Sequence, residues 1–125
     1  MYVKYNPHPY KLETGDCVIR ALVKALDSDW DTIYLRLMIL GYQMKNFPDY
    51  NHVWGAFLLQ NGFKVFRLPD VCPDCYTIKD FCNDNPIGTF VLGTGYHVVC
   101  VVDGNYYDTS DSGSEVPAYV FVKGD

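Results

Sequence analysis

Apolar side chains recur at helical spacing in the first half of the chain. Between about Asp16 and Leu26 they fall three or four residues apart, which predicts an amphipathic helix carrying Val18, Ala21, Leu22, Ala25 and Leu26. Asn51 is a suitable cap for a later helix, which Asn61-Gly62 would end through a left-handed residue. The apolar positions of that helix are Val53, Trp54, Phe57 and Leu58.

Between these segments the sequence predicts another helix, over about Asp29 to Leu40. Ser28 supplies a hydroxyl cap and Asp31 an acid three residues further on, as in a capping box. Gly41 follows the last apolar position and predicts the end of the helix. Three helices are therefore expected before the first strand.

The second half of the chain has the alternation that is typical of strands. Phe63 to Leu68 alternates apolar and basic side chains before Pro69, and residues 77–82 predict a short capped helical turn. Further strands are expected at Thr89 to Leu92, His97 to Val102, Asn105 to Asp108 and Tyr119 to Val122. Helices followed by an antiparallel sheet indicate an α+β fold.

Composition limits the domain count and the partners. With 125 residues, 49% of them hydrophobic and 20% charged, we expect a single domain over residues 1–125. The net charge of −5 and the lack of a basic run argue against nucleic acid as a direct partner. The chain shows no secretory signal pattern and no apolar stretch of membrane-spanning length. We therefore expect a cytoplasmic protein that does not bind membranes.

The five cysteines are expected to be reduced, because the chain shows no export signal. One set of ligands could hold zinc: Cys72 and Cys75, with Cys82 and either His52 or Cys100. A structural zinc site usually has a second close pair of ligands, which this sequence lacks. We therefore favour a tight loop with two half-buried thiols, and we expect no metal and no cofactor.

Three residues have the chemistry that a cysteine nucleophile needs. Cys17 begins the first predicted helix, His97 begins a later strand, and Asp108 ends the returning strand. A thiol in the first turn of a helix lies near unpaired amides and the positive end of the helix dipole, which favour the thiolate. Asp16 is expected to cap this helix, and the amide of Cys17 is free to bind an oxyanion.

The turn at Asp103-Gly104 decides which acid faces the histidine. As a two-residue hairpin loop it places positions 97, 99, 106 and 108 on one face of the sheet. His97 and Asp108 are then diagonal neighbours, roughly 7–8 Å apart at the backbone. A three-residue loop with a bulge would shift the register by one and bring Asp111 to His97 instead. The Asp-Gly pair favours Asp108.

These residues resemble the papain-like cysteine peptidase superfamily, and most closely the small peptidase domains of bacteriocin-processing exporters. The resemblance is carried by Asp16-Cys17 opening a helix, His97 leading a Val-rich strand and Asp108 ending the next strand. It implies N-terminal helices that carry the cysteine, packed against a C-terminal antiparallel sheet that carries the histidine and the acid. The site would lie in the cleft between them.

The chain departs from that family at the oxyanion hole. The family usually has a glutamine about six residues before the cysteine to bind the oxyanion, and this chain has Lys11 there. The candidates for the role are Lys11 itself, Asn6 and Thr14. A lysine can support an oxyanion by its charge, but its flexible stem positions that charge less well than an amide. The sequence therefore leaves open whether the site is active.

The sequence thus predicts a cysteine peptidase or isopeptidase that acts on a peptide or protein substrate. Cys17, His97 and Asp108 would form its triad, and the reaction would pass through a thioester. An acyltransferase would use the same three groups. The alternative from another class is an inactive papain-like binding module, such as a phage or bacterial accessory protein. Four aromatic residues have two interpretations, as the lining of a substrate groove or as core packing: Tyr42, Phe47, Trp54 and Tyr96.

Overall fold

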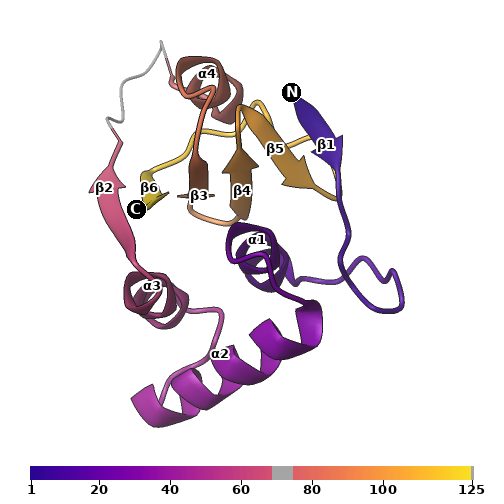
Figure 1. The fold of residues 1–125 in the computed structure, drawn as a ribbon, viewed down its shortest axis with the longest axis vertical. Coiled ribbons are helices and arrows are strands. Elements are labelled where there is room, and N and C mark those ends of the chain that lie inside the picture. The colour runs from indigo at the N-terminus through magenta and orange to yellow at the C-terminus, as the bar shows by residue number, and fades with distance from the viewer. Residues whose placement is uncertain (69–74, 125) are drawn as a thin grey trace.

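The structure, a computed structural model, describes residues 1–68 and 75–124. It is a mixed α+β fold, as expected, with four helices and six strands in the described residues (Figure 1). In chain order these are β1 (Tyr2–Lys4), α1 (Cys17–Ala25), α2 (Trp30–Met44), α3 (Asn51–Gln60), β2 (Phe63–Arg67), α4 (Ile78–Asp84), β3 (Thr89–Gly93), β4 (Val98–Val102), β5 (Asn105–Asp108) and β6 (Tyr119–Lys123). No helix of the described residues is long and apolar enough to cross a membrane.

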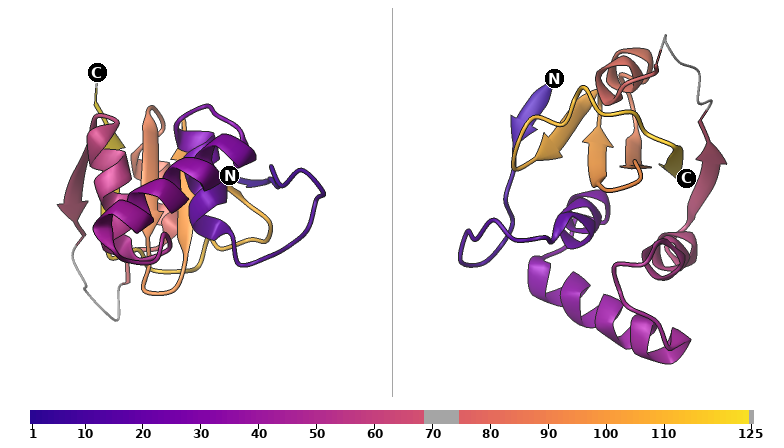
Figure 2. Two further views of the ribbon diagram at one scale, coloured as in Figure 1. Left: turned by 90° about the horizontal axis from the view of Figure 1, so that it is seen from below. Right: turned by 180° about the vertical axis from the view of Figure 1, so that it is seen from behind.

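The six strands form one sheet with helices on both faces. The strand order is β1-β5-β4-β3-β6-β2. Alternate residues of β4 belong to different apolar clusters, because successive side chains of a strand point to opposite faces. Val98 and Cys100 pack with α1, α2 and α3, whereas Val99 and Val101 pack with α4. The views in Figure 2 show α1, α2 and α3 as a layer on one side of the sheet.

β2 to β6 pair antiparallel, as predicted, but an additional N-terminal strand makes the sheet mixed. β1 pairs in parallel with β5, in the register Tyr2 with Tyr106 and Lys4 with Asp108. Three residues are too few to show an alternating pattern, so sequence periodicity could not reveal this strand. The N-terminal ammonium also donates to the carbonyl oxygen of Gly104 at 2.8 Å. The edge next to β5 is therefore covered by the start of the chain.

The hairpin between β4 and β5 has the predicted register. Val102 pairs with Asn105 and Val101 with Tyr106. Asp103 and Gly104 have φ values of 50° and 79°. Positive φ at both central residues is characteristic of the type I′ turn, which matches the twist of the strands.

The second helix is longer than predicted, because Gly41 lies inside it. α2 continues to Met44, and the next residue, Lys45, caps it with a left-handed φ of 55°. A side chain at position 41 would place its Cβ 2.8 Å from the carbonyl oxygen of Asn46. Gly41 therefore allows the loop after the helix to pack closely against it, and it does not end the helix.

The predicted caps of all three N-terminal helices need correction. Asp29, not Ser28, caps α2, and its carboxylate accepts from the Thr32 amide at 2.8 Å. Tyr50 occupies the cap position of α3, while the Asn51 side chain accepts from the Trp54 indole. Asp16 precedes α1 but makes no capping hydrogen bond. In α2 the Asp29 carboxylate, not the Ser28 hydroxyl, caps the helix, because a carboxylate is the stronger hydrogen-bond acceptor.

Candidate active site

Cys17 and His97 meet where the N-terminus of α1 faces the start of β4. Cys17 is the first residue of α1 and is half-buried. Its thiol lies beside the His97 side chain and the backbone of Val98. The first amides of a helix have no acceptor within the helix. The sulfur therefore lies at a helix end, beside the imidazole and close to amide donors.

The opposite side of the His97 ring contacts a buried carboxylate. Nε2 lies 2.5 Å from Oδ2 of Asp108, whose side chain is 1% exposed, compared with 22% for His97. Because Asp108 occupies Nε2, Nδ1 is the ring atom left for the thiol. One imidazole thus bridges the sulfur of α1 and the acid at the end of β5.

These contacts favour a thiolate–imidazolium pair. Burial raises the pKa of Cys17, but the hydrogen bonds from His97 and Val98 bring it below its ordinary value. The hydrogen bond to Asp108, followed by the one to Cys17, raises the pKa of His97 to about 10. A deprotonated thiol next to a protonated imidazole is the nucleophilic state of such a pair.

The Asp108 carboxylate accepts hydrogen bonds from four groups of the described residues. Oδ2 accepts from His97 and from the Ser112 hydroxyl at 2.7 Å. Oδ1 accepts from the Thr109 amide at 2.8 Å and from Nη2 of Arg20 at 3.0 Å. Burial raises the pKa of this carboxyl, but His97 and Ser112 bring it below its ordinary value. The acid is therefore charged and fixed in position.

Arg20 connects this carboxylate to the start of α1. Its Nη1 donates to Oδ1 of Asp16 at 2.8 Å, and the side chains of both partners are 5% exposed. The other oxygen of Asp16 accepts from the Trp30 indole at 2.9 Å. Sequence reasoning missed the roles of Arg20, Ser112 and Trp30. A usable signal existed for Arg20, which is an arginine on an apolar helix four residues after an acid.

Asp111 does not face the histidine, so the alternative with a bulged turn is wrong. The Tyr106 hydroxyl donates to the Asp111 carboxylate, which also accepts from the Gly113 amide at 3.0 Å. The two-residue turn sets this outcome, because it leaves no extra residue to shift the register.

A cavity of about 450 Å³ opens beside the thiol and the imidazole. Cys17, His97, Thr14, Trp54 and Tyr96 are among its lining residues. A neighbouring hollow of about 790 Å³ shares four lining residues with it: Asn51, Thr94, Gly95 and Tyr119. The two hollows are therefore adjacent.

The predicted groove residues separate into two groups. Trp54 and Tyr96 line the cavity at the thiol, although Trp54 is otherwise fully buried in the core. Tyr42 and Phe47 line a different hollow, beside the end of α2. The prediction that all four line one groove is therefore wrong for Tyr42 and Phe47.

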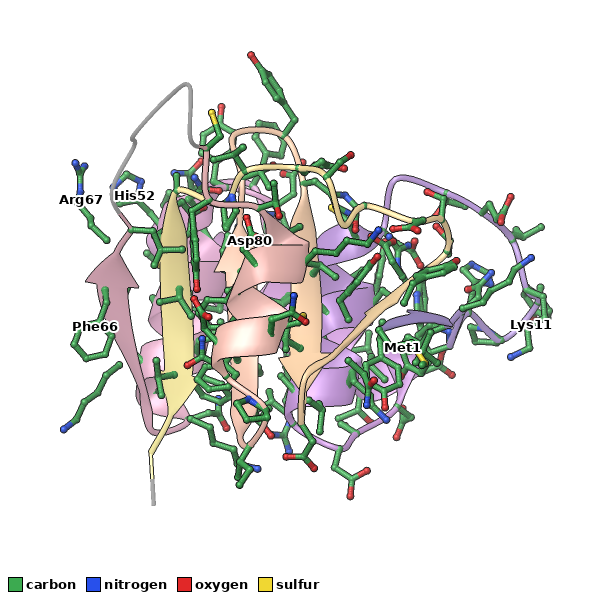
Figure 3. The ribbon with its side chains drawn as sticks, turned by 90° about the horizontal axis from the view of Figure 1, so that it is seen from above. Met1, Lys11, His52, Phe66, Arg67 and Asp80 are labelled. Carbon is green, nitrogen blue, oxygen red and sulfur yellow. The ribbon has the colours of Figure 1, made fainter. Side chains whose placement is uncertain are left out.

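The three oxyanion candidates also differ in position. Thr14 lines the cavity with Cys17, whereas Asn6 and Lys11 are not among the described lining residues. The Lys11 ammonium donates to the carbonyl oxygen of Asn6 at 2.9 Å, and the Asn6 amide donates to that of Leu12. Figure 3 shows Lys11 at the outer end of the loop between β1 and α1. Among the candidates, Thr14 is the side chain nearest the chemistry.

Cys75, Cys82 and Cys100 are not among the described residues that line the cavity at Cys17. Cys82 belongs to α4, on one face of the sheet. Cys100 of β4 packs against α1, α2 and α3 on the other face, so the sheet separates the two thiols. Cys75 is disulfide-bonded, which corrects the expectation that all thiols are reduced. Cys72, the other half of the proposed zinc pair, lies outside the described residues. Cys82 and Cys100 cannot serve one metal from opposite faces of a sheet.

Comparison of the chain with known protein families, with curated proteins and with solved structures found no match. The chemistry of the site must therefore be argued from its geometry.

Proposed function

We propose that this chain is a cysteine peptidase or isopeptidase with a papain-like arrangement of Cys17, His97 and Asp108. One observation carries the proposal: the His97 ring lies between the Cys17 thiol and the buried Asp108 carboxylate. A buried structural cysteine would need none of these partners. The perturbed pKa values and the open cavity at the same thiol support a chemical role.

The reaction follows from the protonation states. The Cys17 thiolate attacks a carbonyl carbon, forming the C–S bond while the carbonyl π electrons move to oxygen. The proton on Nδ1 of His97 passes to the leaving nitrogen as the C–N bond breaks, which leaves a thioester. Water then attacks the thioester, His97 takes its proton, and the C–S bond breaks to restore the thiolate. Asp108 keeps the ring oriented and stabilises its charge throughout.

The oxyanion would be bound at the N-terminus of α1. The Cys17 amide is one donor, because amides of the first helical turn have no acceptor within the helix. Thr14 lines the same cavity, and its hydroxyl is the second candidate donor. Two neutral donors of this kind replace the lysine considered from the sequence.

Alkylation of the thiols by iodoacetamide, mapped by mass spectrometry over a range of pH, tests the nucleophile. We expect Cys17 to react with an acid-shifted profile, because its thiolate persists below the usual thiol pKa of about 8.5. In His97→Ala the profile should return to that of an ordinary thiol. His52→Ala is the matched control, since His52 is an exposed histidine at the start of α3. An unshifted profile in the wild type would refute an activated thiol.

Hydrolysis is tested separately with a peptide library whose cleavage products are read by mass spectrometry. Cleavage should disappear in Cys17→Ser. If the library is turned over only when amines are added, the reaction is acyl transfer. An activated thiol without any turnover, combined with capture of an intact peptide, would support the binding module instead.

A further inference from the structure

α2 carries an apolar seam that faces away from the rest of the molecule. Only Ile33, Leu37 and Gly41 are buried on this helix of 15 residues. Leu35, Met38 and Tyr42 are 60%, 46% and 73% exposed, and they recur at intervals of three and four residues. Tyr34 and Ile39 flank them and are also exposed. Figure 1 shows α2 at the end of the helical layer, with no described element on its outer side.

The same spacing extends to one charged residue at each end of the seam. Asp31 precedes Leu35 by four residues. Lys45, the left-handed residue after the last turn of α2, follows Tyr42 by three, and its ammonium lies 3.9 Å from the centre of the Tyr42 ring. Both charged residues are exposed. The seam therefore has the heptad spacing of a coiled coil, with an acid at one end and a base at the other. Asp31 and Lys45 are each seven residues from Met38, so the two charges are symmetric about that methionine.

A second copy of this chain complements that pattern in one orientation. Two copies of α2 packed antiparallel, with the twofold axis at Met38, place Asp31 of each copy beside Lys45 of the other. A parallel pair would put like charges together at both ends. A membrane surface would leave Asp31 without a partner, and the net charge of −5 opposes anionic lipid.

The shape of the surface has the same symmetry. A hollow of about 290 Å³ lies beside the end of α2, lined by Gly41, Tyr42, Lys45, Asn46, Phe47 and Tyr50. Leu35 lies three residues before Met38 and Tyr42 four residues after it. In the antiparallel pair, Leu35 of one copy therefore lies beside Tyr42, at the wall of the hollow in the other. By the twofold symmetry, the exposed Leu35 side chain of each copy therefore lies at the hollow of the other copy.

From these observations we propose that α2 is a homodimer interface, formed by antiparallel pairing of the seam Asp31, Leu35, Met38, Tyr42 and Lys45 across a twofold axis at Met38. A helix of this length is about 22 Å long, so the pair buries an area at the small end of specific interfaces, below about 1,200 Å². The dimer is therefore expected to dissociate in the micromolar range.

Sedimentation velocity over the micromolar range tests the proposal on the full chain. We expect a concentration-dependent dimer for the wild type. Met38→Glu should weaken it by roughly tenfold or more, because the two carboxylates face each other at the axis. Ile87→Glu is the control, since Ile87 is exposed on a different part of the molecule. A wild type that stays monomeric, or a Met38→Glu variant as dimeric as wild type, would overturn the proposal.

A charge exchange tests the orientation. Asp31→Lys and Lys45→Asp should each weaken the dimer, because each places like charges together, and the double variant should restore it. Failure of the restoration would refute antiparallel pairing. In a Cys17→Ala background, Met38→Cys should form a disulfide-linked dimer on mild oxidation, whereas Ile87→Cys should not. Equal cross-linking of both would also refute an axis at Met38.

Discussion

Asp108 is the residue that sets the charge of His97. It is almost fully buried and is fixed by four donors, so its carboxylate faces the ring without water between them. Replacing it with asparagine keeps the shape and removes the charge. The pKa of His97 should then fall toward its ordinary value and the thiolate should lose its partner.

We therefore expect Asp108→Asn to move the alkylation profile of Cys17 to higher pH. At pH 6 the rate should fall by up to roughly 100-fold, since an ordinary thiol has well under 1% thiolate at that pH. The measurement is the pH dependence of labelling by mass spectrometry. Asp111→Asn is the matched control, because that carboxyl faces Tyr106. An unchanged profile for Asp108→Asn would show that this acid does not set the charge of the ring.

Arg20 is a second residue whose effect can be isolated. It is 4% exposed and lies between the buried carboxylates of Asp16 and Asp108. Arg20→Met leaves Asp16 without a cation and Asp108 with the His97 imidazolium alone, which should destabilise the fold by about 3–5 kcal/mol. Arg20→Lys should restore little, because an ammonium lacks the planar fork that reaches two acids at once.

Chemical denaturation with urea measures this loss. Arg36→Met is the control, since Arg36 is an exposed arginine on α2. If Arg20→Met and Arg36→Met unfold at the same urea concentration, the buried network does not contribute to stability.

Asp29 is the cap that matters at the start of α2. Its carboxylate accepts from the amide and the hydroxyl of Thr32, at 2.8 Å and 3.0 Å. Asp29→Ala should therefore lower the free energy of unfolding by about 1 kcal/mol. Ser28→Ala, which removes the cap expected from the sequence, should change it by only a few tenths of a kcal/mol. Urea unfolding of the two variants decides between the caps, and a larger loss for Ser28→Ala would contradict the structure.

The elements that could be predicted from the sequence are those specified locally. The turn at Asp103-Gly104 has its own backbone preference, so it fixes the pairing of β4 with β5 and brings His97 to Asp108. Gly41 predicted the wrong helix end, because a glycine is needed at this position for close packing against Asn46 and not for ending the helix. β1 could not be predicted, since its partner β5 is about a hundred residues away.

The same distinction applies to the site as a whole. Cys17, His97 and Asp108 could be named because each has a characteristic position at the end of an element. Arg20 and Ser112 could not be assigned, because their roles depend on how α1 and the loop after β5 pack around one carboxylate. The site thus lies where the helical layer meets the sheet, and its ionisation is linked to folding of the whole chain.

That linkage predicts how stability depends on pH. In Cys17→Ala the thiolate is absent, and the hydrogen bond to Asp108, the larger cause, still raises the pKa of His97 above 6.5. Below pH 6.5 both the folded and the unfolded states hold the proton, so the His97–Asp108 pair contributes its full stabilisation. Above that pH the unfolded state releases the proton and the folded state retains it, so the free energy of unfolding falls as pH rises. Asp108 acts oppositely: its lowered pKa gives stability that is lost only as pH falls below its ordinary value of 3.8.

Stability of Cys17→Ala should therefore decline from about pH 6.5 up to the raised pKa of His97. Urea unfolding across this range measures the decline. In the double variant with His97→Gln the side chain cannot ionise, so the slope should disappear while the acid-side loss of other paired carboxylates remains. A decline of equal slope in both variants would mean that His97 is not held as an imidazolium by Asp108. That result would remove the electrostatic basis of the proposed nucleophile, because the ion pair at Cys17 depends on the same buried acid.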